Sequence, residues 1–313
     1  MKKILLLTLI LTTLLSTGNF ANASLISDRA YRISQNKEIH NSEKQIRKVL
    51  KIHNIFANKH DLEALKSLYA DNYMNNDGFN KNIYFESIQE TWASCKDLTY
   101  TTDILSVKID GDYASVHVKE TATGTISDTI EETQIAGEIH SKSTGIYHFQ
   151  KINGNWYISG ETSLTDESSL LYGDARFLNI EIQAPTQVFS GDTYVTTVKV
   201  DGGSNTYIVG SIDRDIVTYP ASTPKSTLRA FPQSNILERY LKANTKNTNE
   251  YTIASLALSK FDEKNPRTKL YMSGLACVMK RINVIPKNEL ARESTATNNK
   301  INVTNLKKVK GKK

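Results

Sequence analysis

The stretch of sequence that decides the fold covers residues 61–73 and reads Asp61-Leu62-Glu63-Ala64-Leu65-Lys66-Ser67-Leu68-Tyr69-Ala70-Asp71-Asn72-Tyr73. Asp61 is suited to cap a helix, and apolar side chains follow it at the spacing of one helix face as far as Tyr69. We therefore predict a helix here. A second one is predicted before it, because a capping box formed by Ser42 and Gln45 precedes residues at the same spacing: Ile46, Val49, Leu50, His53, Phe56 and Ala57.

Beyond these helices the pattern changes from helix to strand. A third helical stretch is expected over residues 83–94, and from Leu98 onward apolar residues recur with a period of two. Asp110-Gly111 and Asn153-Gly154 favour two-residue hairpin turns, because both dipeptides tolerate positive φ angles. The Thr-rich segment 121–138 indicates a longer hairpin excursion. Helices followed by antiparallel hairpins predict an α+β fold, with helices packed on one face of a curved sheet.

Two segments resemble the nuclear transport factor 2-like superfamily: residues 61–73 and the closing segment Asn153-Gly154-Asn155-Trp156-Tyr157-Ile158. That superfamily includes ketosteroid isomerase-like and polyketide cyclase-like (SnoaL-like) members. The resemblance covers residues 42–165 and implies a cone, in which the helices close the concave side of the sheet over a pocket. It also implies dimerisation through the open sheet face. It does not identify a reaction, because such a fold hosts enzymes, ligand carriers and assembly modules alike.

The resemblance implies where a site would lie. In enzymes of the superfamily an Asp or a His acts as the base and a Tyr as the oxyanion donor, which here implies His117 or Asp77 acting with Tyr73. None of these positions matches an enzyme motif residue by residue. Packing is the alternative role for the aromatic residues, and His53 is expected to be a hydrogen-bonded core residue. The predicted binding positions in the pocket are Tyr69, Tyr73, Tyr84, Trp92, His117, His148 and Trp156.

A second unit is expected over residues 176–286, after a polar linker at residues 166–175. Short alternating segments separated by turn dipeptides predict an all-β sandwich. Residues 184–192 resemble the opening strand and turn of bacterial immunoglobulin-like modules, although the Cys-Trp-Cys signature of antibody domains is absent from the sequence. A short connecting helix is expected over residues 235–243. An exposed apolar or aromatic patch on this sandwich would favour it, rather than the cone, as the binding surface.

Both ends of the chain suggest its cellular location. Two lysines, a short apolar run and the small-residue site ending at Ala23 predict a secretory signal peptide over residues 1–23, with an uncleaved anchor as the alternative. The protein would then act outside the cytoplasm, in the periplasm or secreted. Residues 24–41 are typical of a flexible leader. Residues 287–313 indicate a disordered Lys-rich tail, for which contact with an anionic surface is the alternative role.

Charge and cysteine content narrow the classes of function. The formal net charge is +6, but lysines of the signal peptide and the tail account for the excess, so the remaining body is close to neutral. Nucleic-acid binding is therefore not predicted. Cys95 and Cys277 fall in different units, and we favour two buried free thiols over a disulfide.

The sequence contains no zincin helix, nucleophile elbow, Cys-x-x-Cys pair, phosphate loop or dinucleotide fingerprint. Catalytic residues, a metal and a cofactor are therefore not predicted. We predict an exported, non-catalytic module of the cell envelope that binds a small apolar ligand in the cone, or a protein or polymer partner. The alternative is an isomerase, dehydratase or cyclase with a His or Asp base. That alternative requires an ionisable group of perturbed pKa in a closed cavity, whereas the binding hypothesis predicts an apolar or open cavity without one.

Overall fold

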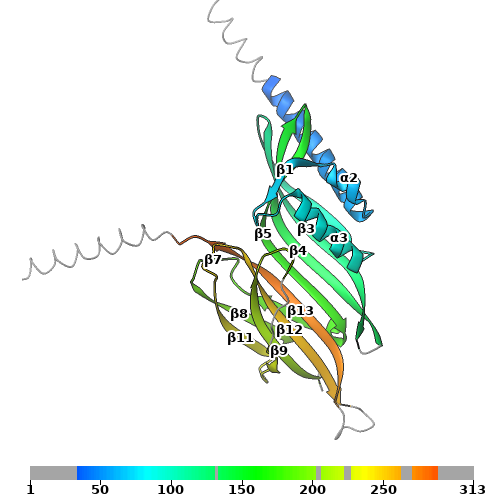
Figure 1. Cartoon of the computed structure of the whole chain (residues 1–313), viewed down its shortest axis with the longest axis vertical. Helices are drawn as coiled ribbons and strands as arrows, with labels where there is room; N and C mark the ends of the chain where they lie inside the picture. The colour runs from blue at the N-terminus through cyan, green and yellow to red at the C-terminus, as the bar shows by residue number, and fades with distance from the viewer. Residues whose placement is uncertain (1–33, 131–132, 202–205, 222–226, 262–269, 288–313) are drawn as a thin grey trace, which may run out of the picture.

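The computed structural model describes residues 34–130, 133–201, 206–221, 227–261 and 270–287. Figure 1 shows an elongated molecule built along one long sheet. In the described part of the chain, this sheet has ten strands; its main path follows the order β10-β9-β12-β13-β5-β4-β3-β2, with β1 beside β5 and β7 beside β13. A second sheet follows the order β11-β8-β6. The predicted signal peptide and almost all of the predicted tail lie outside the described residues.

The elements have the following bounds. The first helix covers residues 34–58, and it is followed by α2 (Leu62–Lys66), α3 (Lys81–Ser94) and the short 3-10 helix η1 (Asp174–Phe177). The strands are β1 (Tyr69–Asn75), β2 (Thr99–Asp110), β3 (Tyr113–Ile130), β4 (Thr133–Ile152), β5 (Asn155–Gly173), β6 (Asn179–Gln183), β7 (Gln187–Phe189), β8 (Thr193–Asp201), β9 (Thr206–Ile216), β10 (Arg229–Ala230), β11 (Ile236–Lys242), β12 (Glu250–Phe261) and β13 (Leu270–Ile285).

The first helix packs one face against the sheet, because its buried residues recur every three or four positions. Ile46, Leu50, His53 and Ala57 form this face. Ser42 lies on the same face, inside the helix and buried, so the predicted capping box there is wrong. Residues 34–41 are helical as well, which corrects the expected flexible leader for this part of it. Residues 24–33 lie outside the described residues.

The helix predicted from residue 61 is shorter than expected. Asp61 caps α2 as predicted, accepting a hydrogen bond from the Ala64 backbone nitrogen at 3.1 Å, but α2 ends at Lys66. Tyr69 and Tyr73 belong to β1, which pairs in parallel with β5, and both are buried. A spacing of four fits one face of a helix and one face of a strand equally well, so the apolar pattern did not separate them.

The third helix, the second hairpin turn and the long hairpin excursion agree with the predictions. α3 begins at Lys81 with Asn80 as its N-cap, close to the predicted start. Asn153 and Gly154 form the loop of the β4–β5 hairpin, with positive φ angles of 50° and 83°. In the β2–β3 hairpin, Asp110 pairs with Tyr113, so the loop lies one residue later than the predicted dipeptide. The long hairpin excursion is formed by the ends of β3 and β4.

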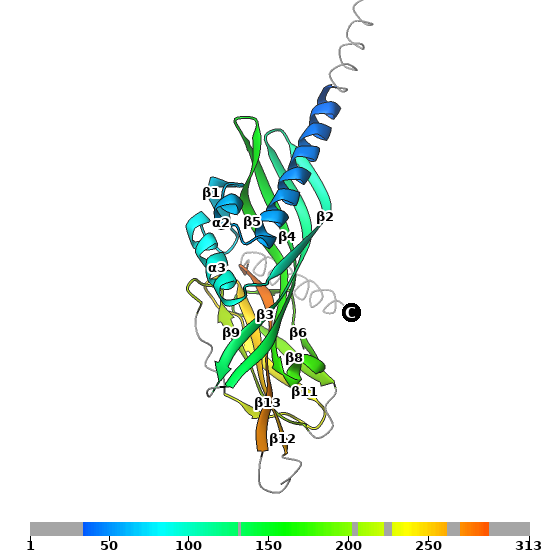
Figure 2. The same cartoon turned by 90° about the vertical axis from the view of Figure 1, so that its right-hand side faces the viewer.

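The helices and the three-stranded sheet cover opposite faces of the long sheet. Ile139 of β4 packs against the core under the helices and pairs directly with Leu170 of β5, so both face that side. Leu171, the next residue along β5, packs into a second core with residues of β8 and β11. Neighbouring residues of a strand point to opposite faces. Figure 2 shows α2 and α3 on one side of the long sheet and β6, β8 and β11 on the other.

Two predictions for the second half are wrong. The expected linker at residues 166–175 is instead the end of β5, which pairs with both β4 and β13, followed by the start of η1. The two predicted units therefore share one sheet. The helix expected at residues 235–243 is β11, paired with β8. Its buried residues Leu237 and Leu241 again lie four apart. The all-β packing is present, and its immunoglobulin-like identity stays a prediction.

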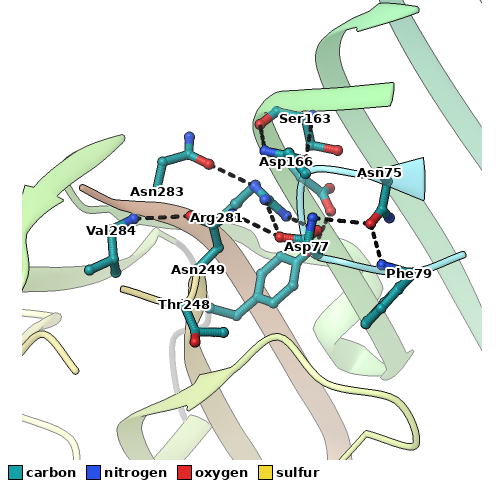
Figure 3. A network of polar contacts seen from close by, with 12 residues as sticks. Asn75, Asp77, Phe79, Ser163, Asp166, Thr248, Asn249, Arg281, Asn283 and Val284 are labelled. Atoms are coloured by element: carbon teal, nitrogen blue, oxygen red, sulfur yellow. Dashed lines mark hydrogen bonds and ion pairs between the residues drawn. The ribbon is translucent and has the colours of Figure 1, made fainter. Parts of the chain in front are cut away.

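A buried ion pair joins the turn after β1 to strand β13 (Figure 3). The Arg281 guanidinium donates to both carboxylate oxygens of Asp77, at 2.6 and 2.9 Å, and these side chains are only 2% and 6% exposed. Asn249 donates to Asp77 at 2.8 Å. Asn283 accepts from Arg281 Nε and donates to the Leu164 carbonyl. This network, which we call the clasp, fixes the cone against β13, in the second half of the chain.

Cys95 and Cys277 are free thiols, as predicted, with Cys95 buried and Cys277 partly exposed. Among the helices of the described residues, none combines the length and the apolar character needed to cross a membrane.

Candidate functional site

A cavity of about 170 Å³ lies between the helices and the sheet, where the resemblance implied a pocket. The first helix contributes His53 to its lining, and α3 contributes Tyr84, Ile88 and Trp92. α2 contributes Leu65, and the strands β2, β3 and β4 contribute chiefly Tyr100, Thr102, Glu120, Ala122 and Tyr147.

Glu120 provides a carboxyl group in the cavity. It follows Val116 and Val118 along the core-facing side of β3, because residues two apart share a face. Thr102 donates a hydrogen bond to Glu120 Oε1 at 3.0 Å, and the Tyr147 hydroxyl donates to the same oxygen at 3.1 Å. Burial raises the pKa of Glu120 above its ordinary value, and these two hydrogen bonds only partly offset the increase.

A second carboxyl group, that of Glu161, lies beside the first. The pairing of β4 with β5 shifts by one residue at Ser159. This β-bulge reverses the face of the sheet to which each following residue of β5 points. Glu161 therefore pairs with Tyr147 and faces the core. The Tyr73 hydroxyl donates to Glu161 Oε2 at 3.2 Å. Burial, and then the charge of Glu120, raise the pKa of Glu161 to about 7.

His53 and three tyrosines complete the polar interior. His53 Nε2 lies 2.8 Å from the Tyr69 hydroxyl, which confirms His53 as a hydrogen-bonded core residue. Burial lowers the pKa of His53 to about 4, so its ring is neutral at pH 7. The rings of Tyr69, Tyr73 and Tyr84 lie 5.1 to 5.7 Å apart, centroid to centroid. Burial and the charge of Glu161 raise the pKa of all three hydroxyls, so they act as hydrogen-bond donors rather than as anions.

The structure brings together four of the seven predicted binding positions. Tyr84 and Trp92 line the cavity, and Tyr69 and Tyr73 lie next to it through the contacts described above. Trp92 is held in place by a 2.9 Å hydrogen bond from its ring nitrogen to the Tyr100 hydroxyl. Its ring also stacks on His60, with centroids 4.6 Å apart.

The other three positions lie elsewhere. Trp156 is buried in the core at the start of β5 and does not line the cavity. His117 and His148 occupy strand positions between core-facing residues, so they point to the opposite face of the sheet. His148 contacts the Thr162 hydroxyl there at 2.9 Å. Asp77 is bound to Arg281 in the clasp. The expected pairing of His117 or Asp77 with Tyr73 is therefore wrong, because neither His117 nor Asp77 lines the cavity.

Sequence reasoning missed both glutamates. The alternation that places Val116 and Val118 inward also places Glu120 inward, so that residue was accessible to the same argument. The same argument could not place Glu161, because the face to which its side chain points depends on the bulge at Ser159. In the described part of the chain, no three His, Cys, Asp or Glu side chains gather in a metal-binding arrangement.

Solved structures that match this chain include nuclear transport factor 2-like and scytalone dehydratase-like proteins. A nuclear transport factor 2-like superfamily protein from Salmonella enterica serovar Typhimurium has 15% identity and a TM-score of 0.34, covering 40% of this chain and 91% of its own. The scytalone dehydratase-like protein from Novosphingobium aromaticivorans has 10% identity and a TM-score of 0.35, covering 41% and 86%. A type 2 hexachlorocyclohexane dehydrochlorinase has 12% identity and a TM-score of 0.34, covering 41% and 87%.

Nuclear transport factor 2-like proteins, the superfamily that the sequence resembles, are thus among these neighbours. The likeness concerns the fold alone, and it assigns no activity at these identities. No family model matches the sequence, and no curated protein matches it.

Proposed function

We propose that this chain is exported and that its cone binds a small molecule in the cavity beside Glu120. Export is supported by the signal-peptide pattern of residues 1–23. Binding is supported by a cavity with aromatic walls and a few polar groups, among them Glu120, which is the usual composition of a small-molecule pocket. We further propose that the β-rich second half is an immunoglobulin-like module of the cell envelope, and that it carries the cone without taking part in binding.

The single observation that carries this proposal is the position of Glu120. Its carboxyl group lies in the cavity, on the apolar face of β3, and burial raises its pKa. Placing such a group on a core-facing position is costly, and a ligand that hydrogen-bonds to it would reduce that cost. A polar ligand therefore fits the cavity better than the purely apolar ligand expected from the sequence.

Binding is tested with a library of small fragments by ligand-observed NMR, using wild-type chain and the variant Ala122→Leu, which places a larger side chain in the cavity. Thr123→Leu is the matched control, because Thr123 is the next residue of β3 and is exposed on the opposite face. We expect fragments that bind wild type and Thr123→Leu but not Ala122→Leu, provided that circular dichroism shows all three chains folded. Equal fragment binding by Ala122→Leu would contradict the proposal.

A second candidate function is proton transfer, in an isomerase, dehydratase or cyclase. The observation in its favour is the pKa of about 7 at Glu161, since a catalytic acid or base works best when its pKa lies near the operating pH. In this candidate the base is a glutamate rather than a His or an Asp. Fragments from the screen are incubated with the protein in heavy water. Deuterium uptake or conversion that Glu161→Gln abolishes would support catalysis, and fragments recovered unchanged would contradict it.

A further inference from the structure

The cavity has a carboxyl group with no cationic side chain beside it. Among the described residues that line it, Glu120 supplies the one carboxyl group, and the ring of His53 is neutral at pH 7. Neither Lys nor Arg is among these lining residues, and none forms an ion pair with Glu120 or Glu161 in the described chain. A partly buried carboxylate normally has a cation beside it, because its lost hydration is otherwise not replaced.

Compensation is present at two other buried carboxylates of the described chain. Asp77 is paired with Arg281 in the clasp, and the fully buried Glu250 is paired with Arg214 at 3.1 Å. Glu120 instead accepts hydrogen bonds from two neutral hydroxyls, those of Thr102 and Tyr147. The cone cavity therefore differs from these two sites in lacking a protein cation at its acidic group.

The walls of the cavity are aromatic on several sides. Tyr84 and Trp92 come from α3, Tyr100 from β2 and Tyr147 from β4, so the rings come from the helical and the strand side of the cavity. The face of an aromatic ring carries partial negative charge and attracts ammonium groups, and recognition of quaternary ammonium ligands by aromatic cages uses this property. Aromatic rings around a carboxylate favour a cation with apolar substituents over a strongly hydrated inorganic ion.

We propose that the ligand of the cone cavity is a small organic cation, an amine or quaternary ammonium compound, whose charge lies against Glu120 and whose carbon atoms lie against the aromatic walls. This inference rests on the proposed function, because it specifies the ligand of the same cavity. A neutral ligand would leave the charge of Glu120 uncompensated, and an anion would add repulsion from Glu120 and Glu161. Of the three charge classes, a cation supplies what the described residues lack.

The test uses cations paired with neutral molecules of nearly the same shape: choline with 3,3-dimethylbutan-1-ol, and benzylamine with benzyl alcohol. Each is titrated into the chain lacking only its predicted signal peptide, near pH 8 and at low salt, by calorimetry. We expect each cation to bind at least about tenfold more tightly than its neutral partner, which corresponds to about 1.4 kcal/mol. In Glu120→Gln this preference is expected to disappear, while Thr123→Leu keeps it.

The outcomes separate the inference from the function on which it rests. Neutral molecules that bind as tightly as the cations, in a manner that Ala122→Leu abolishes, would overturn the cationic ligand and leave the binding cavity in place. If no probe shows binding that Ala122→Leu abolishes, both the cationic ligand and the proposed cavity are rejected. Should Glu120→Gln fail to fold, the comparison of charged and neutral probes on wild type, with Ala122→Leu as the blocked form, still decides the question.

Discussion

Glu161 faces the core of the cone only because β5 contains one extra residue at Ser159. Without that bulge the strand alternation would carry the residue after Gly160 to the outer face, where a carboxylate is hydrated and unremarkable. Facing inward, it accepts a hydrogen bond from Tyr73 and lies close enough to Glu120 for their charges to interact. One local backbone irregularity therefore determines whether the site contains one carboxyl group or two.

Replacing Glu161 by Gln is expected to stabilise the protein above pH 7. The pKa of Glu161 is about 7 in the folded chain and 4.5 in the reference state, so between these values the folded chain binds more protons than the unfolded chain. The free energy of unfolding therefore falls as pH rises through this window, by at most about 3 kcal/mol. Gln stays neutral at every pH and avoids this loss.

Urea unfolding of wild type and Glu161→Gln at several values between pH 4.5 and 8 measures the effect. The two curves should lie close together at the acidic end and diverge toward pH 8, with the variant the more stable. Glu86→Gln, an exposed residue of α3, serves as the control and should show no such divergence. The low pKa of His53 affects wild type and variant alike, so it cancels in the difference. Parallel curves for wild type and Glu161→Gln would show that Glu161 ionises normally.

At the scale of the element, the sequence predicts a helix, strand or turn well when the residues that determine it are close together in the chain. α3 and the Asn153-Gly154 turn were predicted well, because caps and turn dipeptides act within a few residues. β11 and the first residue of β1 were predicted as helical, and the buried residues of both strands lie four apart, a spacing shared by both structures. Whether such a segment becomes a strand is decided by its partners, β5 and β8, which are distant in sequence.

The polar residues at the end of β5 were misread for a related reason. Asp166, Glu167 and Ser168 have the composition of a linker, yet each finds a partner across the sheet. Tyr251 donates to Asp166 at 2.6 Å, Lys280 donates to Glu167 at 2.6 Å, and Ser168 contacts the Ser141 hydroxyl at 3.0 Å. Polar composition indicates a loop only where no such partners exist, and those partners are 27 to 113 positions away in the chain. Local sequence patterns therefore could not predict that the two halves of the chain share one sheet.

Removing the N-cap of α3 is expected to loosen the helix that carries Tyr84 and Trp92. The Asn80 side chain accepts a hydrogen bond from the Ile83 backbone nitrogen at 3.1 Å, and replacing an N-cap Asn by Ala costs about 1 kcal/mol. Thermal unfolding followed by circular dichroism should show Asn80→Ala less stable than wild type. Asn82→Ala is the matched control, because Asn82 is exposed in the first turn of the same helix and does not cap it. Equal melting temperatures for the two variants would exclude a capping contribution.

At the scale of the whole molecule, β4 and β5 serve two cores. The same strands carry residues into the cone on one face and toward the three-stranded sheet on the other. Since a strand is rigid along its length, the cone cannot rotate freely against the second half. Two domains joined by a flexible linker could. The clasp adds a second connection beside β5, between the turn after β1 and β13. Because β1 also carries Tyr73, which donates to Glu161, the clasp helps to hold one wall of the site.

A double-mutant cycle on the clasp tests this connection. Asp77→Asn leaves the Arg281 charge buried without a partner, and Arg281→Met does the same to Asp77, so each single variant should lose about 3 to 5 kcal/mol of unfolding free energy. The double variant leaves no unpaired charge and should lose much less than the sum of the two. Arg47→Met is the control, because it breaks an exposed ion pair with Glu43 and should cost less than about 1 kcal/mol. Urea unfolding of all four variants gives these values. Single clasp variants as stable as Arg47→Met, or strictly additive losses, would mean that the two halves are held together by the shared strands alone.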